Sequence, residues 1–403
     1  MGAGLAGLAC ALECRRLGRR VTVLEASDGV GGRVRSDTVD GFRLDRGFQV
    51  LLTAYPEAAR RLDLDALDLR RFEPGALVRR NGGFHRVADP FRQPTKLLAT
   101  ARSPVGSSIG KARIALLRRR LLAADPRQLL RAPETTTAER LRAAGFSAEI
   151  IERLFRPWFA GVMCDPELRT TSRMFDVLFR MFAAGDSAVP ATGMQAISDQ
   201  LAAGLPDGAV RLDTPVRSVR ADGVVTEDGA DLAASAVVVA TDGVRAAELT
   251  PIERPGSRGS TTMWFAAERA PIDEPVLLLD GDGCGPAQSA AVISNVAPDY
   301  ALAGGSLVVA SIAGTTAPDL EEAVRTQLTG WFGPAVRSWR LLREDRIAHA
   351  LPEQSVPTSP KRNARLTNGV YICGDHRDTA SIQGALFSGR RAAATLVAGN
   401  GGV

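Results

Sequence analysis

Three glycines at the start of the chain, Gly2, Gly4 and Gly7, form a G-x-G-x-x-G pattern, and the chemistry of that pattern is pyrophosphate binding. Its glycines let the backbone turn tightly and approach the phosphates, and the helix that follows directs its N-terminus at their negative charge. Here the glycines lead into apolar residues at helical spacing and then into a β-branched run that ends at Glu25. Glu25 lies 21 residues after Gly4, where this pattern places the carboxylate that accepts from a ribose hydroxyl. The order of these elements predicts a nucleotide site.

The glycine pattern also requires a strand directly upstream, yet only Met1 precedes Gly2. We therefore expect Met1 to lie at the end of a first strand. A strand of ordinary length would extend the natural chain upstream by about five to ten residues.

Other residue types that could perform chemistry form no catalytic set. His376 follows Asp375 and could carry a proton near a cofactor, although such a loop histidine more often serves only as a hydrogen-bond donor. His85 and His349 have no neighbours typical of metal ligands, and the five cysteines lack the paired spacing of a zinc site. We find no Ser/His/Asp set or pair of carboxylates, and we predict no metal.

The composition is that of an ordinary soluble protein. Of the 403 residues 45% are hydrophobic and 24% are charged, and no apolar run is long enough to cross a bilayer. No secretory signal is visible, so we expect a cytoplasmic protein. The net charge of +5 comes almost wholly from arginine, without basic stripes interleaved with aromatic residues, and this excludes nucleic acid as an expected partner.

The pattern of apolar residues divides the chain into alternating parts. Residues from about 85 to 190 show helical spacing, whereas strand patterns and Asp-Gly turns begin near residue 212. The C-terminal segment repeats the opening order of strand, glycine turn and helix. We predict an α/β fold in which a discontinuous, three-layer, Rossmann-like domain (1–75, 190–245 and 341–403) carries an inserted α+β substrate domain (76–189 and 246–340).

Four stretches together resemble the superfamily of flavin-containing amine oxidases, protoporphyrinogen oxidases and phytoene (carotenoid) desaturases. They are "GAGLAGLACALECRRLGRRVTVLEA", "GVGGRVRSD", "AVVVAT" and "GVYICGDHRDTASIQGALFSG", and they are spread over the whole chain. The last is especially close to the desaturase form of the C-terminal flavin motif. The resemblance implies an FAD-dependent oxidoreductase with the Rossmann-like FAD/NAD(P)-binding fold.

The resemblance also implies the residues that hold FAD. Gly2, Gly4 and Gly7 would hold the pyrophosphate, Glu25 the adenosine ribose, and Asp375 the phosphate–ribityl region. Val216 falls where the family clamps adenine, and the helix near Ile382 would face the flavin pyrimidine ring. The full set is Gly2, Gly4, Leu5, Ala6, Gly7, Glu25, Ala26, Gly31, Gly32, Arg33, Val216, Gly374, Asp375, Ser381, Ile382 and Gln383.

The implied reaction is two-electron dehydrogenation or desaturation of a hydrophobic organic substrate, with hydride transfer to flavin N5. Two alternatives stay open: oxidation of an amine at its C–N bond, and a flavin-binding chaperone or carrier without catalysis. The chain has only three tyrosines, which weakens the amine alternative, because amine oxidases often place two aromatic rings facing the flavin. The sequence does not distinguish dioxygen from a quinone as the electron acceptor.

Residues 92–131 contain ten Lys or Arg residues against one acid, Asp125, interleaved with the apolar clusters "RIALLRRRLLAA" and "RQLLRA". A run of charges usually forms a solvated face. The alternative is a peripheral contact with an anionic membrane, in which leucines lie at the headgroup boundary and arginines face lipid phosphates. In that case the protein would lie on the inner face of the membrane.

Overall fold

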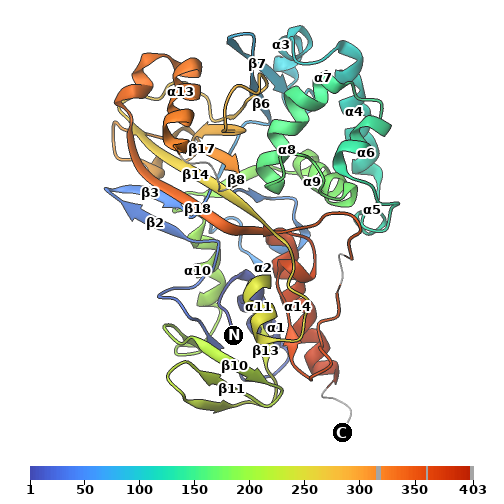
Figure 1. Ribbon diagram of the computed structural model, residues 1–403, viewed down its shortest axis with the longest axis vertical. Coiled ribbons are helices and arrows are strands. Elements are labelled where there is room, and N and C mark those ends of the chain that lie inside the picture. Colours follow the sequence, from blue (N-terminus) through green and yellow to red (C-terminus); the bar gives the residue numbers. More distant parts are fainter. Residues whose placement is uncertain (315–318, 360–361, 400–403) are drawn as a thin grey trace.

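The structure is a computed structural model that describes residues 1–314, 319–359 and 362–399 and shows a mixed α/β protein (Figure 1). The N-terminus and the last described helix, which ends at Gly399, lie at one end of the molecule, beside short strands. A large mixed sheet and a group of helices form the other end.

Short parallel strands form the layer that carries the N-terminal glycines. They are β1 (Val23–Leu24), which pairs with β9 (Val210–Arg211), and β13 (Val238–Val239), which pairs with β19 (Tyr371–Ile372). Residues 1–3 lie between the two pairs, because Gly2 N donates to Leu24 O (2.7 Å) and the Met1 amino group donates to Val238 O (2.8 Å). They occupy the position that we expected for the end of a strand. The upstream extension of the natural chain stays a prediction.

Two helices that lie far apart in the sequence pack closely against each other beside this layer. They are α1 (Leu5–Arg16) and α14 (Ile382–Gly399). A Cβ atom on Gly389 would lie 2.1 Å from the Ala6 carbonyl oxygen, so this position needs glycine for the two backbones to approach. The packing brings the N-terminal and C-terminal segments together.

The predicted Asp-Gly turns at 222–223 and 228–229 are confirmed. They connect the antiparallel strands β10 (Val216–Arg220), β11 (Gly223–Thr226) and β12 (Asp231–Ala233).

A seven-stranded mixed sheet separates two cores. Its strands, in spatial order, are β18 (Arg340–Pro352), β14 (Ser257–Ala267), β17 (Ser306–Ala313), β16 (Ser289–Val292), β15 (Leu277–Leu279), β6 (Gly75–Arg80) and β7 (Gly83–Ala88). Along β14, Met263 and Phe265 join the core under α13 (Leu320–Phe332), whereas Trp264 between them joins the larger core on the other face. This period of two is that of a sheet buried on both sides.

β18 pairs with β14 along most of its length and therefore belongs to the large sheet. Our predicted boundary instead assigns residues from 341 on to the nucleotide-binding domain. The strand is charged and only partly buried, so its sequence lacks the apolar signal that would have indicated a sheet strand. The other domain boundaries stay predictions.

The helical region predicted for residues 85–190 covers the second face of the sheet. Its helices are α3 (Leu97–Arg102), α4 (Ser108–Ala123), α5 (Pro126–Leu129), α6 (Thr137–Ala143), α7 (Ala148–Ile150), α8 (Arg156–Met163) and α9 (Ser172–Ala184). Pro157 lies within this region, yet the chain continues through a π-helical turn, η2 (Ile151–Phe155), directly into α8. Pro157 lacks an N–H donor, and the wider π-helical turn directly before it accommodates the loss of one helical hydrogen bond.

Shorter elements connect these parts. They are the strands β2 (Ser36–Val39), β3 (Phe42–Asp45), β4 (Leu51–Leu52), β5 (Leu69–Arg71) and β8 (Ser187–Pro190), the helices α2 (Pro56–Arg61), α10 (Gln195–Ala203), α11 (Gly243–Leu249) and α12 (Ile293–Val296), and the 3₁₀ turns η1 (Pro94–Lys96), η3 (Pro298–Tyr300), η4 (Pro334–Ser338) and η5 (Asp375–Arg377). No helix in the described part of the chain is both long and apolar enough to cross a bilayer.

Candidate active site

A cavity of about 960 Å³ joins the glycine-rich layer to the sheet and the helical region. Fourteen of the sixteen residues predicted to hold a cofactor line it; they are Gly2, Gly4, Leu5, Ala6, Glu25, Ala26, Gly31, Gly32, Arg33, Val216, Gly374, Asp375, Ser381 and Ile382. Its volume is at the upper end of the range typical of ligand pockets. It is therefore large enough for a long cofactor together with a substrate.

Two glycines shape the wall of this cavity by adopting backbone conformations that other residues rarely adopt. Gly2 has φ +92°, and a Cβ atom on it would lie 2.8 Å from Ala240 O. Gly31 has φ +114°, and its Cβ atom would lie 2.4 Å from Val34 O. The Gly31 N–H also donates to Ala3 O (2.8 Å), which joins the two glycine loops. Glycine at both positions leaves a bare backbone surface for a ligand to approach.

The N-terminus of α1 opens into the same cavity. Gly4 precedes the helix and has no side chain that could cap it. The N–H groups of the first turn, beside the cavity-lining Leu5 and Ala6, therefore have no side-chain cap. Gly7 does not line the cavity. A Cβ atom on Gly7 would lie 1.9 Å from Gly2 O, so this glycine lets the helix pack against the turn instead of contacting a ligand. This corrects the role that we assigned to it.

Glu25 fixes the glycine turn as well as facing the cavity. Its Oε2 accepts from Ala3 N (2.6 Å), and its Oε1 accepts from the N–H and the hydroxyl of Ser27 (3.0 and 2.8 Å). A carboxylate has about four acceptor positions, so one remains for a ligand hydroxyl. The carboxylate is thus held in one orientation before any ligand arrives.

Arg33 and Asp375 come from opposite ends of the chain and form an ion pair at the cavity wall. Arg33 Nη2 donates to Asp375 Oδ1 (2.7 Å), and Arg33 Nη1 donates to Ala350 O (2.7 Å). Gly374, at φ +147°, directs Asp375 toward this pair, and its N–H donates to Ser388 Oγ (2.9 Å). The pair presents positive and negative groups side by side, which suits a ligand with both phosphate and hydroxyl groups.

The N-terminus of α14 closes the cavity with Ser381 and Ile382, but the neighbouring Gln383 does not line it. The Gln383 side-chain oxygen accepts from Glu57 N (2.8 Å), and this hydrogen bond joins α14 to α2. The Gln383 side chain is thus turned to α2, and its contact with a cofactor stays a prediction. Consecutive residues at a helix start point in different directions, and the sequence alone does not show which of them faces the cavity.

His376 is buried behind Gly374 and does not line the cavity. Neither ring nitrogen has a hydrogen-bond partner among the described residues, and burial lowers the pKa of the imidazole to about 4. The ring is therefore neutral at physiological pH and lies away from the space where a substrate would react. This position does not support the proton-carrier hypothesis for His376.

The opposite wall of the cavity is apolar and aromatic. Trp158 from α8 contacts both Phe179 and Phe182 from α9, and Phe48 and Phe72 approach from the loops between short strands. Our sequence analysis did not name these residues. The aromatic side chains at helical spacing in "RPWFAGVM" and "MFDVLFRMFAA" were the available signal. Helical spacing alone could not distinguish a cavity wall from an ordinary core.

Polar groups in this part of the cavity are few and already paired. Arg258 donates to the fully buried Asp165 (3.1 Å). Cys164 also lines the cavity, but burial raises the pKa of its thiol to about 12, so it is protonated and not a nucleophile at neutral pH. The chain therefore offers position and an apolar environment here, without an obvious acid or base.

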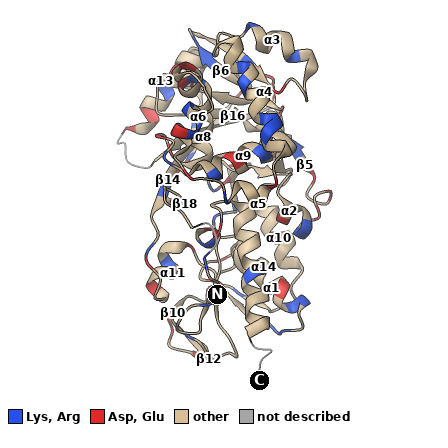
Figure 2. Cartoon of the chain, turned by 90° about the vertical axis from the view of Figure 1, so that its right-hand side faces the viewer, with Lys and Arg blue, Asp and Glu red and all other residues tan. Residues whose placement is uncertain are grey.

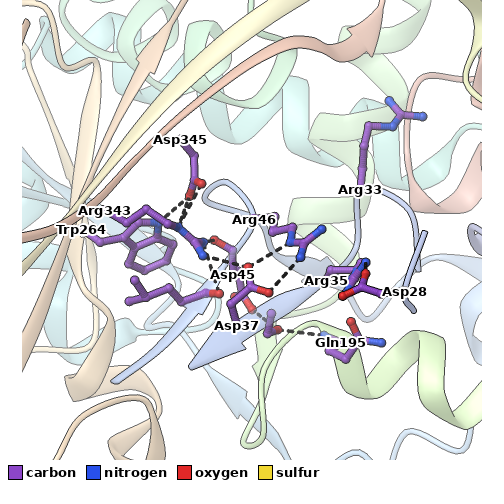
Figure 3. A network of polar contacts seen from close by, with 12 residues as sticks. Asp28, Arg33, Arg35, Asp37, Asp45, Arg46, Gln195, Trp264, Arg343 and Asp345 are labelled. Carbon is purple, nitrogen blue, oxygen red and sulfur yellow. Dashed lines mark hydrogen bonds and ion pairs between the residues drawn. The ribbon is translucent and has the colours of Figure 1, made fainter. Parts of the chain in front are cut away.

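A charged network joins the β2–β3 hairpin to the large sheet next to the cavity (Figure 3). Arg343 from β18 donates to Asp37 (2.8 Å) and Asp345 (3.0 Å), and Arg46 makes two bonds of 2.9 Å to Asp37. Figure 3 shows Arg33 pointing away from this network. Arg46 lines the cavity, and the network holds it between the β2–β3 hairpin and β18 of the large sheet.

Asp45 lies in the same region and is fully buried. It accepts hydrogen bonds from Ser36 Oγ (2.5 Å), Met194 N (2.9 Å) and Tyr300 OH (2.8 Å). Burial raises the pKa of this carboxyl to about 6, and this effect exceeds that of the three hydrogen-bond donors, which lower the pKa. Asp45 therefore serves to hold β3, α10 and η3 together, outside the cavity lining.

Comparisons with known proteins agree with this geometry. The model of the family described as flavin containing amine oxidoreductase matches residues 5–397. Protoporphyrinogen oxidase 2 of Arabidopsis thaliana is 28% identical over 182 residues, which are 45% of this chain and 35% of that protein. Phytoene dehydrogenase of Streptomyces griseus is 37% identical over 116 residues, which are 26% of this chain and 23% of that protein. The chain thus aligns with only about a third or a quarter of the length of these relatives.

Solved structures share the fold over nearly the whole chain. An oxidoreductase from Methanosarcina mazei has a TM-score of 0.73 at 16% identity, with 98% of both chains covered. Putrescine oxidase bound to putrescine has a TM-score of 0.69 at 19% identity, again with 98% of both chains covered.

Proposed function

Because the chain belongs to the flavin-containing amine oxidoreductase family and is an oxidoreductase, we propose that it binds FAD and dehydrogenates or desaturates a hydrophobic organic substrate. The supporting observation is a single cavity with two kinds of wall. One wall has bare glycine backbone, an uncapped helix N-terminus and charged groups, and the other is apolar and aromatic.

The polar wall fits a dinucleotide such as FAD. Gly2 and the start of α1 would hold the pyrophosphate, and the free acceptor position of Glu25 suits a ribose hydroxyl. Val216 and Asp375 also line the cavity, and they would contact adenine and the second half of the cofactor, respectively. A site for FMN alone would have no use for Glu25 and Val216.

When bound, flavin supplies an acceptor for two electrons at N5. The chain itself binds and orients the substrate and excludes water from it. Trp158, Phe179 and Phe182 form an apolar surface that favours a hydrophobic molecule and offers no partner for a charged one.

Oxidation of an amine at its C–N bond is the alternative reaction. Putrescine, which is bound in one of the similar structures, carries two positive charges at neutral pH. In the present cavity the lining carboxylates of Glu73 and Asp89 are already paired with Arg86 and Arg118, so they offer no free partner to an ammonium group. The cavity therefore favours dehydrogenation of a neutral or anionic hydrophobic substrate over diamine oxidation.

The test uses anaerobic bleaching of the bound flavin. We expect the purified protein to be yellow and to lose its flavin absorbance on addition of a hydrophobic donor of the phytoene or protoporphyrinogen type, but not on addition of putrescine. Bleaching by putrescine alone would replace our proposal with the amine alternative. A flavin that photoreduction bleaches but no donor reduces would indicate a carrier, and a protein that retains no flavin would contradict the proposal altogether.

A further inference from the structure

Large apolar side chains are exposed mainly in one segment of the molecule. Eight such residues are exposed in the described part of the chain, and five of them lie between residues 91 and 116. These five, which we call the α3–α4 patch, are Phe91, Leu97, Leu98, Ile109 and Leu116, each 52–65% exposed. Single exposed apolar residues are ordinary, but a group confined to 26 consecutive residues indicates an interaction surface.

Helix α4 carries apolar residues on two sides. Gly110, Leu117 and Leu121 are its buried residues, whereas Ile109 and Leu116 lie seven residues apart on its exposed side. Only Thr100 is buried among the six residues of α3. The exposed leucines and isoleucine therefore do not pack into the core of this protein. A partner that covered them would bury their apolar surface.

The charges beside the patch are positive and unpaired. No carboxylate lies within ion-pair distance, among the described residues, of Lys96, Arg102, Arg113, Arg119, Arg120, Arg127 or Arg131. The paired basic residues of the segment are Arg92, which contacts Asp186, and Arg118, which contacts Asp89 (2.9 Å). Four of these unpaired cations (Arg102, Arg113, Arg119 and Arg120) lie on the same two helices as the exposed apolar side chains, which favours a partner that is both negatively charged and apolar.

The patch also borders the cavity. Phe91 and Leu97 belong to both, and Lys111, Ala112 and Ala115 of α4 line the cavity as well. Figures 1 and 2 place α3 and α4 at the end of the molecule opposite to the N-terminus and α1, with Lys and Arg along α4. A molecule that enters the cavity at this end therefore passes the patch first.

We propose that the α3–α4 patch docks on the surface of an anionic lipid bilayer. Leu98, Ile109 and Leu116 would lie at the boundary between headgroups and acyl chains, and the unpaired arginines would face lipid phosphates. An anionic bilayer supplies apolar volume and dense negative charge in one partner, as a helix lying in the interface requires. Delivery of a hydrophobic substrate from the bilayer to the cavity rests on the proposed function, whereas binding to vesicles does not.

The experiment measures sedimentation of the full-length, flavin-loaded protein with vesicles of phosphatidylcholine, with or without a third of phosphatidylglycerol. We expect binding to the anionic vesicles at low salt and release as the salt concentration rises. Arg113→Gln/Arg119→Gln/Arg120→Gln should lower the partition coefficient about a hundredfold, since each basic residue near the surface contributes about a factor of five. Arg60→Gln/Arg254→Gln/Arg337→Gln removes the same charge from exposed sites elsewhere and serves as the matched control.

A second pair of variants tests the apolar contact. Leu98→Ser/Ile109→Ser should lower vesicle binding about tenfold, and these residues do not line the cavity, so flavin content should be unchanged. Leu212→Ser/Leu302→Ser is the control at exposed apolar residues outside the segment. Binding to neutral vesicles as tight as to anionic ones at low salt would overturn the proposal, and so would equal losses in the test and control variants. Self-association in solution that Leu98→Ser/Ile109→Ser abolishes, without any binding to vesicles, would assign the patch to a second copy of the chain instead.

Discussion

Replacing Glu25 with glutamine tests whether the glycine-rich wall recognises the adenosine half of FAD. The Glu25 carboxylate accepts three hydrogen bonds from Ala3 and Ser27, and among the described residues its Oε2 accepts from Ala3 alone. One acceptor position on Oε2 therefore remains for a ribose hydroxyl. Glutamine keeps the shape of the side chain but replaces one acceptor oxygen with a donor and removes the charge.

The expected loss follows from one hydrogen bond to a charged group. Such a bond contributes about 1.5–3 kcal/mol, so FAD affinity should fall about ten- to hundredfold. FMN has no adenosine ribose, and its affinity should change little. The diagnostic quantity is therefore the ratio of the two affinities, because distortion of the glycine turn alone would weaken both flavins.

The assay removes the flavin, then titrates the apoprotein with FAD and FMN while following the quenching of flavin fluorescence. Ser27→Ala serves as the control, because it removes the hydroxyl that holds Glu25 but leaves the carboxylate in place. Its FAD-to-FMN ratio should stay close to that of the parent protein. Equal losses for FAD and FMN in Glu25→Gln, or no loss for either, would refute the assignment of Glu25 to the ribose.

Two further predictions concern the charges that hold the cavity walls in place. Burial raises the pKa of Asp45 from 3.8 to about 6, so its contribution to stability is full below about pH 4 and is lost as the pH rises through 6. In urea titrations, the difference in unfolding free energy between the parent protein and Asp45→Asn should change by about 3 kcal/mol over this interval. A difference that stays constant with pH would contradict the raised pKa. Arg258→Met leaves the fully buried Asp165 without its cation and should cost about 3–5 kcal/mol of unfolding free energy. Arg220→Met removes an exposed double ion pair and should cost less than about 1 kcal/mol. Similar losses of the two variants in urea unfolding would show that the burial of Asp165 does not determine the cost of removing its cation.

The sequence predicted the polar wall well because backbone geometry determines that wall. Gly2 and Gly31 must be glycine where φ is positive and a neighbouring carbonyl is close, and this requirement is visible in a single sequence. The same reasoning placed Glu25 and Asp375 at the ends of short strands that converge on the cavity. It did not show that the Gln383 side chain turns to α2 or that His376 is buried behind Gly374, because helix rotation and loop burial decide these directions.

The apolar wall was not predictable in the same way. Trp158 and Phe179 follow ordinary helical spacing, and only the packing of α8 against α9 turns them toward a cavity. The π-helical turn η2 contributes to this, since it shifts the register of the helix directly before α8. A cavity wall and a protein core can contain the same residue types. They differ in whether empty space remains between the helices, and a local sequence pattern does not show this.

The sequence leaves two interpretations of the charge run of residues 92–131 open, and the structure adds observations that bear on them. In a merely solvated face the exposed side of α4 would be polar, yet Ile109 and Leu116 lie there while Arg118 turns inward to Asp89. The inward Arg118 lines the cavity, and the outward Arg119 and Arg120 stay without a carboxylate among the described residues. Contact with water alone does not explain exposed apolar side chains beside unpaired cations. That combination favours a surface that meets lipid beside the cavity wall to which α4 contributes.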